Sequence, residues 1–147
     1  MPTVPLVSDE AASPEVGAVF DDIRATRKTD FINNFWRALA VHPPTLRRTW
    51  ESVKQVMAPG ALDPLTKELL YIAVSATNGC SYCVHSHTAS ARAKGMSDAQ
   101  LGELLAIVGM ANETNKLVET LQVPVDEVFL VEAAPAPTPP KRAKRRK

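Results

Sequence analysis

The sequence predicts an all-α fold, a compact bundle of about six to seven helices. Helix-start signals recur along the chain, and apolar residues follow them at intervals of three and four, the periodicity of an amphipathic helix. The 147 residues include only six glycines, and aromatic residues make up 5% of the chain, so we expect a core of Leu, Val, Ile and Ala. This length corresponds to one domain.

Two predicted helices have clear start signals, and one of them also has a clear stop signal. Ser13 and Asp63 each precede a proline, which places a capping side chain before a proline at the first helical position. The first helix is expected to end near Arg27. The other is expected to end at Asn78 and Gly79, because both residue types tolerate the left-handed backbone of a helix stop.

Further segments with helical periodicity lie between and after these two. They are a helix capped by Asp30 and stopped by His42, Pro43 and Pro44, a helix from Pro44 to about Met57, a helix from Cys80 or Ser81 to Lys94, a helix capped by Ser97, and a final amphipathic segment from Asn112 to Leu121. In the first of them, Phe31, Phe35 and Trp36 are expected on the buried side. Residues 123–131 fit either a strand-like arm or a helical extension.

Composition and charge divide the chain into an irregular N-terminal arm (1–12), a helical domain (13–132) and a Pro/Ala-rich basic tail (133–147). We expect the tail to be disordered, because it lacks large apolar residues. Its positive charge comes from Lys141, Arg142, Lys144, Arg145, Arg146 and Lys147. Without these six residues, 11 basic residues face 16 acidic ones. The tail is either a solubilising segment or a nonspecific contact for nucleic acid or an acidic partner.

The start of the chain and its longest apolar stretch indicate location. MPTVPLVSDEAASPE has neither the basic nor the apolar region of a secretory signal. The apolar stretch around 69–76 is too short to span a bilayer. We therefore expect a cytoplasmic protein with no membrane contact, in which two cysteines are reactive or metal-bound rather than a structural disulfide.

The segment from Glu68 to His87 contains the candidate catalytic residues. On a helix that begins near Cys80, the side chains of Cys80, Cys83 and His87 share one face, whereas His85 projects nearly opposite. The unpaired N–H groups and the dipole at the helix start favour a thiolate. His87 can accept the thiol proton or donate one to a leaving oxygen.

Glu68 is expected to lie beside His87. Glu68 is about ten residues before the break at 78–79, and His87 is about eight residues beyond it. If the two helices fold back antiparallel, the two side chains reach a similar depth. A carboxylate in that place orients the imidazole and stabilises its charged form.

Other interpretations of the same residues stay open. The two cysteines with His85 and His87 are candidate zinc ligands, although zinc sites usually draw ligand pairs from two separated segments. Alternatively, the cysteines are small buried hydrophobes, and Glu68 is an exposed acid of the first helical turns. No glycine-rich phosphate loop is present, and we predict no cofactor and no metal.

At these residues the sequence resembles the alkylhydroperoxidase D and carboxymuconolactone decarboxylase superfamily. The shared pattern is Glu68, eleven residues, Cys80-x-x-Cys83, three residues and His87, and the likeness extends from about residue 15 to 121. The resemblance implies an all-helical fold that forms homotrimers or homohexamers.

The resemblance also implies a role for each residue of the motif. By position, Cys83 is the peroxidatic cysteine, Cys80 resolves it, and Glu68 with His87 forms the proton relay. Peroxidase members often have a histidine where this chain has Tyr82, which is a candidate pocket-lining residue. The implied partners are a hydroperoxide substrate and an external thiol reductant.

Three functions follow from these observations. The first is a thiol-dependent peroxidase or disulfide oxidoreductase that reduces alkyl hydroperoxides. The second is a carboxymuconolactone decarboxylase-like enzyme that acts on a small organic acid through Glu68 and His87, although decarboxylase members generally lack the cysteine pair. The third is a non-catalytic oligomeric redox or stress protein whose basic tail contacts nucleic acid.

Overall fold

The computed structural model describes residues 2–130, and this part of the chain contains six α-helices, one 3-10 turn and no strand. The predicted all-α fold is confirmed. The helices are α1 (Pro14–Arg27), α2 (Asn34–Leu39), α3 (Pro43–Met57), α4 (Pro64–Thr77), α5 (Ser81–Ala93) and α6 (Asp98–Leu121), followed by the 3-10 turn η1 (Glu127–Phe129). The basic tail at 133–147, with its predicted disorder and nucleic-acid contact, lies outside the described residues.

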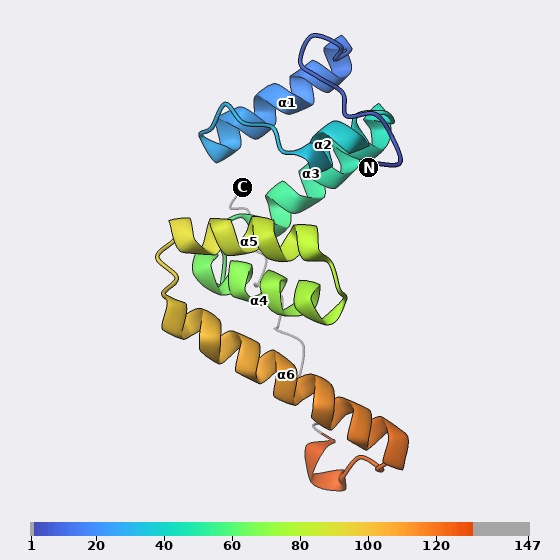
Figure 1. Ribbon diagram of the computed structural model, residues 1–147, viewed down its shortest axis with the longest axis vertical. Helices are drawn as coiled ribbons and strands as arrows, with labels where there is room; N and C mark the ends of the chain where they lie inside the picture. Colours follow the sequence, from blue (N-terminus) through green and yellow to red (C-terminus); the bar gives the residue numbers. More distant parts are fainter. Residues whose placement is uncertain (1, 131–147) are drawn as a thin grey trace, which may run out of the picture.

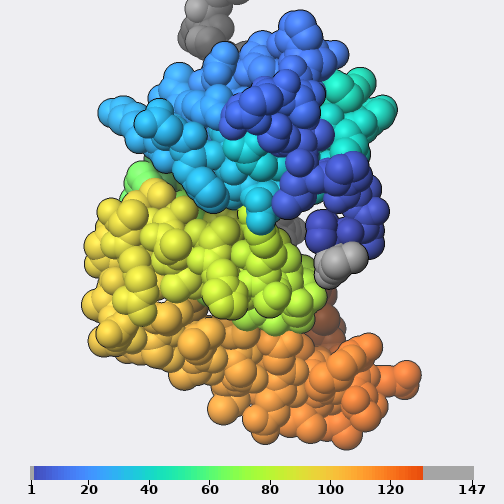
Figure 2. All heavy atoms as spheres, turned by 45° about the horizontal axis from the view of Figure 1, so that its top comes forward, coloured from blue at the N-terminus to red at the C-terminus, as the bar shows by residue number. Residues whose placement is uncertain are grey.

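The helices form two groups with separate cores. α1, α2 and α3 pack together at one end of the molecule, and α4 and α5 form an antiparallel hairpin that α6 crosses on the other side (Figure 1). In Figure 2, the group of α1 to α3, the α4–α5 hairpin and α6 follow one another as three layers. The first core consists of Val16, Val19, Phe20, Ile23, Ile32, Trp36, Ala40, Leu46 and Trp50. The second has only Ile72, Ala91 and Met96 fully buried, so it provides much less apolar burial than the first.

Three helix starts follow the local signals in the sequence. The Ser13 hydroxyl accepts a hydrogen bond from Val16 N at 3.3 Å, and the Asp63 carboxylate caps α4. At the start of α6, Ser97 and Gln100 form a reciprocal capping box. These starts depend only on neighbouring residues, and the predictions for them are confirmed.

The predicted start of α2 is wrong. The helix begins at Asn34 rather than after Asp30. The carbonyl oxygens in between accept hydrogen bonds from arginine side chains: Asp30 O from Arg24 Nε and Ile32 O from Arg37 Nε, both at 3.1 Å. Carbonyls engaged in this way hold the segment in an irregular conformation instead of a first helical turn.

The later start of α2 also changes which aromatic residues are buried. Trp36 lies in the first core, as expected, and its ring meets Trp50 edge-on. Phe31 was expected to be buried but is 68% exposed, and Phe35 is exposed as well. Because Phe31 precedes the helix and Phe35 is adjacent to Trp36, neither phenylalanine shares the buried face of this short helix.

α6 is longer than predicted. The predicted helix from Ser97 and the final segment from 112 to 121 form one continuous helix of 24 residues. Asn112 does not interrupt it, because its side-chain amide donates to Val108 O at 2.8 Å and to Thr77 Oγ1 at 3.1 Å. Residues 123–130 form neither a strand nor a continuation of α6 and contain only the short turn η1, so both alternatives are wrong there.

The C-terminal part of α6 presents apolar side chains to solvent. No residue of α6 is fully buried. Its exposed apolar residues include Ile107, Met110, Leu117, Val118 and Leu121. Within residues 2–130, however, no helix combines the length and apolar character needed to cross a membrane. In a single chain, the second group of helices therefore leaves much of its apolar surface exposed.

Candidate active site

The turn between α4 and α5 positions the two cysteines. Gly79 adopts a φ of 70°, in the left-handed region that favours glycine, and the Cys80 backbone N–H donates to Ser75 O at 2.9 Å. This turn places Cys80 at the N-cap of α5, where its sulfur accepts a hydrogen bond from Cys83 N at 3.3 Å. Both sulfurs therefore lie at the positive end of the α5 dipole.

The cysteines are joined to each other. A disulfide links Cys80 and Cys83, whose Cα atoms are 5.4 Å apart. Both residues are partly buried rather than sealed in a core. The CxxC spacing thus allows the two sulfurs to bond within the first turn of α5, and the structure represents the oxidised form of the pair.

Glu68 and His87 lie together, as the sequence analysis expected from their distances to the turn. His87 Nδ1 is 2.6 Å from Glu68 Oε2, and the two side chains are 21% and 6% exposed respectively. A carboxylate at Nδ1 favours the tautomer with the proton on that nitrogen. The other ring nitrogen, Nε2, then has a lone pair that can accept a proton.

Lys94 is a partner of Glu68 that the sequence analysis missed. Its Nζ lies 2.8 Å from Glu68 Oε1, so each carboxylate oxygen has its own partner from α5. A signal was present in the sequence, because Lys94 follows His87 by seven residues, as His87 follows Cys80. All three positions therefore share one face of α5.

These contacts determine the ionisation of Glu68. Burial, the largest single effect, acts to raise the pKa of the Glu68 carboxyl. The hydrogen bonds from His87 and Lys94, with their charges, outweigh burial and hold this pKa below its ordinary value of 4.5. Glu68 is therefore an ionised carboxylate near neutral pH.

Tyr71 is a second residue that the sequence analysis missed. Its ring stacks on the His87 imidazole with centroids 3.8 Å apart and planes inclined by 16°. Tyr71 is one turn beyond Glu68 on α4, so the spacing of the two residues was the available signal. The stacking and the carboxylate together hold the imidazole in one orientation.

Tyr82 and His85 lie away from this group. The Tyr82 hydroxyl accepts a hydrogen bond from Phe35 N at 3.2 Å, which connects α5 to the start of α2. His85 is exposed, and its Nδ1 lies 2.7 Å from the Ser81 carbonyl oxygen of its own helix. Among residues 2–130, no three His, Cys, Asp or Glu side chains converge as a metal site.

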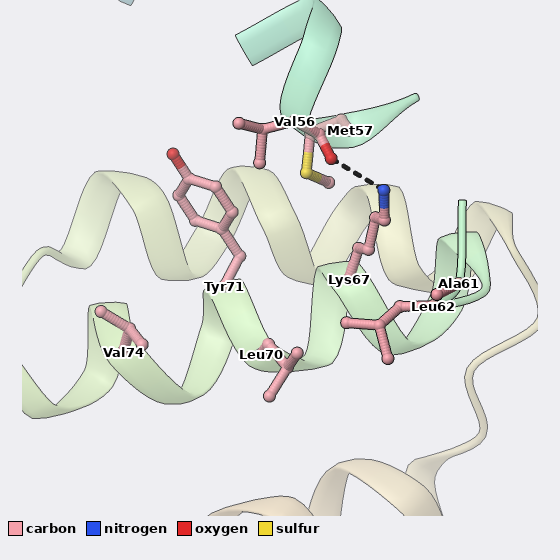
Figure 3. A pocket seen from close by; sticks show the side chains of 8 residues that line it. All are labelled: Val56, Met57, Ala61, Leu62, Lys67, Leu70, Tyr71 and Val74. Carbon is pink, nitrogen blue, oxygen red and sulfur yellow. Dashed lines mark hydrogen bonds between the residues drawn. The ribbon is translucent and has the colours of Figure 1, made fainter. Parts of the chain in front are cut away.

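An apolar groove of about 480 Å³ lies next to the site. The end of α3, the following loop and α4 form it (Figure 3). It is lined by Val56, Met57, Ala61, Leu62, Lys67, Leu70, Tyr71 and Val74. Lys67 contributes mainly its aliphatic stem, because its ammonium group donates to the Val56 carbonyl at 2.8 Å and to Ala58 O. Tyr71 belongs to both the groove and the His87 stack, whereas Tyr82 is not part of the lining.

We predict that Glu68→Gln lowers the free energy of unfolding by about 1–3 kcal/mol near neutral pH, because a neutral amide replaces a buried paired carboxylate. Since the folded-state pKa of Glu68 lies below 4.5, this contribution is full above that value and is lost as pH falls through the lowered pKa. Chemical denaturation of both proteins from neutral to acidic pH measures the difference. Glu103→Gln, on exposed α6 surface, is the control. A wild-type advantage that persists unchanged at strongly acidic pH would contradict the prediction.

The chain is similar to known proteins in both sequence and structure. Residues 43–139 match the carboxymuconolactone decarboxylase family. The crystal structure of the alkylhydroperoxidase AhpD core from Rhodospirillum rubrum ATCC 11170 superposes with a TM-score of 0.86 at 62% sequence identity, over 90% of this chain and 99% of that one.

Curated relatives share shorter stretches. The alkyl hydroperoxide reductase AhpD of Solibacter usitatus is 39% identical over 74 residues, which cover 50% of this chain and 40% of that protein. An uncharacterized protein in the cox locus of Paracoccus denitrificans is 38% identical over 52 residues, 35% of this chain and 47% of that protein. The chain thus spans less than half the length of these two relatives. The matched family region and the AhpD-like fold show that this chain belongs to the carboxymuconolactone decarboxylase family, with its CxxC motif at Cys80 and Cys83.

Proposed function

We propose that this chain is a thiol-dependent peroxidase of the alkylhydroperoxidase type that cycles between the Cys80/Cys83 dithiol and disulfide. The main observation behind the proposal is the disulfide-forming pair at the start of α5, on the helix that carries His87 into contact with Glu68. Two similar proteins, an alkylhydroperoxidase core and an alkyl hydroperoxide reductase, support the reaction class.

The first step oxidises Cys83. His87 accepts the Cys83 thiol proton, and the Glu68 carboxylate stabilises the imidazolium that forms. The thiolate attacks the terminal peroxide oxygen, the O–O bond breaks, and Cys83 becomes a sulfenic acid. The alkoxide that leaves takes the proton from the imidazolium and departs as an alcohol.

The second step forms the disulfide seen in the structure. The Cys80 sulfur attacks the Cys83 sulfur, an S–S bond forms, and the hydroxyl of the sulfenic acid leaves as water with the Cys80 proton. An external thiol reductant then supplies two electrons and two protons, which restores both thiols and oxidises the reductant to a disulfide. The family resemblance assigns the attacking role to Cys83, and the N-cap position of Cys80 next to it suits a resolving thiol.

The groove favours a hydroperoxide with an apolar substituent. Its lining is almost entirely aliphatic and aromatic, and Tyr71 connects it directly to the His87 ring. An alkyl or aryl group in this groove loses contact with water at a favourable transfer free energy. Hydrogen peroxide has no such group and gains nothing from the groove.

A second candidate uses Glu68 and His87 without the cysteines. A buried carboxylate that orients an imidazole can move a proton on a small organic acid, and this pair does not need the sulfurs for its geometry. Activity on such an acid that survives the double replacement of Cys80 and Cys83 by serine would favour this candidate over the peroxidase.

We also propose that the chain works as a homo-oligomer, a trimer or a hexamer. The supporting observation is the exposed apolar surface of α6, which a single chain leaves uncovered. Further copies of this chain would bury that surface next to the hairpin that holds the site.

We predict that Cys83→Ser lowers thiol-coupled reduction of an organic hydroperoxide by about 100-fold or more, because the attacking atom is lost. Cys80→Ser keeps the first step but not the second, so one equivalent of hydroperoxide yields a stable sulfenic acid on Cys83. Dimedone trapping and mass spectrometry locate that group. Equal rates in wild type and Cys83→Ser would end the proposal, and trapping on Cys80 of the wild type would reverse the two roles.

We predict that Leu70→Asn raises KM for cumene hydroperoxide by about 3–10-fold, because a polar amide replaces an apolar part of the groove lining. The KM for hydrogen peroxide serves as the internal control and is expected to stay the same. If both KM values change equally, or neither changes, the groove does not bind the substituent.

We predict that light scattering of the wild type gives a particle several times the 16.0 kDa of one chain. Leu117→Glu, which puts a charge on the apolar side of α6, shifts the particle toward smaller species. Asn115→Glu adds the same charge on the opposite side of the helix and is expected to leave the assembly unchanged. A wild-type particle of one chain would refute the oligomer.

A further inference from the structure

Lys94 is placed to act on the candidate proton relay although it is remote from the cysteines along the chain. It is the C-cap of α5, and its backbone N–H donates to the Ser90 and Ala91 carbonyls, so the stem of the side chain starts from a fixed point. Its side chain is 37% exposed, and its Nζ contacts the almost fully buried Glu68. Lys94 thus brings a positive charge from the protein surface to the inner carboxylate.

The Glu68 carboxylate is shared between two partners. Lys94 contacts Oε1 at 2.8 Å, and His87 contacts Oε2 at 2.6 Å. Since a carboxylate is planar, a donor on one oxygen also sets the direction of the other. Lys94 therefore orients the oxygen that holds His87.

Charged and titratable groups from other elements also face this region. From α1, the Arg27 guanidinium lies over the rings of Trp36 and Trp50, at 5.5 and 5.4 Å from their centroids. Burial lowers the pKa of Arg27, and the charges of Glu68 and Tyr82 act against that effect. From α4, Tyr71 faces His87.

α6 packs on α4, but its ion pairs do not involve Glu68. Asp98 pairs with Arg92, and Lys116 pairs with Glu119. Within residues 2–130, the groups hydrogen-bonded to the Glu68 carboxylate are the His87 imidazole and the Lys94 ammonium. Lys94 is therefore the permanent positive charge in direct contact with that carboxylate.

The His87 imidazole and the Lys94 ammonium share one carboxylate. A carboxylate paired with the imidazole alone stabilises the imidazolium fully, and the ring then releases its proton reluctantly. A second cation on the same carboxylate offsets part of that effect.

We propose that Lys94 is a positioning residue of the relay, which orients the Glu68 carboxylate and shares its charge so that His87 can both accept and release a proton. The part that Lys94 plays in peroxide reduction rests on the proposed function. The effect on the His87 imidazole does not, so the two are tested separately.

The first test is the titration of His87 followed by NMR in the full-length protein. Lys94→Met removes the charge and keeps the length of the side chain, and Lys94→Gln keeps a hydrogen-bond donor without the charge. We expect both to raise the His87 midpoint by about 0.5–1 pH unit, because a nearby cation disfavours the imidazolium. Lys94→Arg is expected to retain the wild-type midpoint. The matched control is Arg92→Met, which removes a cation from the same end of α5 and from a different carboxylate.

The second test is the pH dependence of the reaction of the reduced protein with cumene hydroperoxide. In Lys94→Met the acid limb is expected to move to higher pH by the same amount as the His87 midpoint, which lowers the rate about 3–10-fold along that limb. Arg92→Met is expected to leave the limb in place. If the acid limb of the rate profile does not move with the His87 titration midpoint, the role of Lys94 in the relay is overturned.

The outcomes separate this inference from the proposed function. An unchanged His87 midpoint in both Lys94→Met and Lys94→Gln overturns the inference even if the wild type is a peroxidase. If the Lys94 variants raise the His87 midpoint but the wild type has no peroxidase activity, the control of His87 by Lys94 is supported and the proposed peroxidase function is rejected. A midpoint that moves equally in Arg92→Met overturns the inference, because the effect would then come from any charge on α5.

Discussion

The α4–α5 hairpin depends on one buried carboxylate. Glu68 lies in a part of the molecule whose core has only three fully buried hydrophobic residues, so packing alone defines the pairing of the helices weakly. An ionised group in that place requires partners, and both of them, His87 and Lys94, come from α5. Because these two residues are seven positions apart, any slip or rotation of α5 against α4 breaks at least one contact. The carboxylate therefore sets the register of the hairpin.

That register also determines where the sulfurs lie. Cys80, His87 and Lys94 repeat at intervals of seven along α5, so anchoring the last two to α4 directs the first toward the same side. At the other end, the left-handed backbone of Gly79 lets the chain reverse and places Cys80 at the N-cap. Structural and chemical requirements thus coincide: the contacts that align the helices also put the imidazole and the disulfide on one face.

The parts of this structure that the sequence predicts are those determined by neighbours along the chain. Ser13, Asp63 and Ser97 cap helices within one turn, and counting residues from the turn was enough to pair Glu68 with His87. Lys94 and Tyr71 were missed although their spacing from His87 and Glu68 was a signal, because spacing alone does not distinguish them from the other residues on the same helix faces. The start of α2 was predicted wrongly because side chains of Arg24 from α1 and Arg37 from α2 itself occupy the carbonyls of Asp30 and Ile32.

The unequal cores of the two helix groups explain why the candidate site lies where it does. The group of α1, α2 and α3 buries two tryptophans and seven further apolar residues, so it has the larger core. The hairpin and α6 bury far less and leave apolar side chains of α4 and α6, such as Leu70 and Ile107, in contact with solvent. A redox pair needs access for a substrate and for a reductant, which a fully enclosed core excludes. We infer that the hairpin gains its remaining stability from other copies of the chain, so that the cysteines stay reachable at its turn while the apolar sides of α4 and α6 are covered.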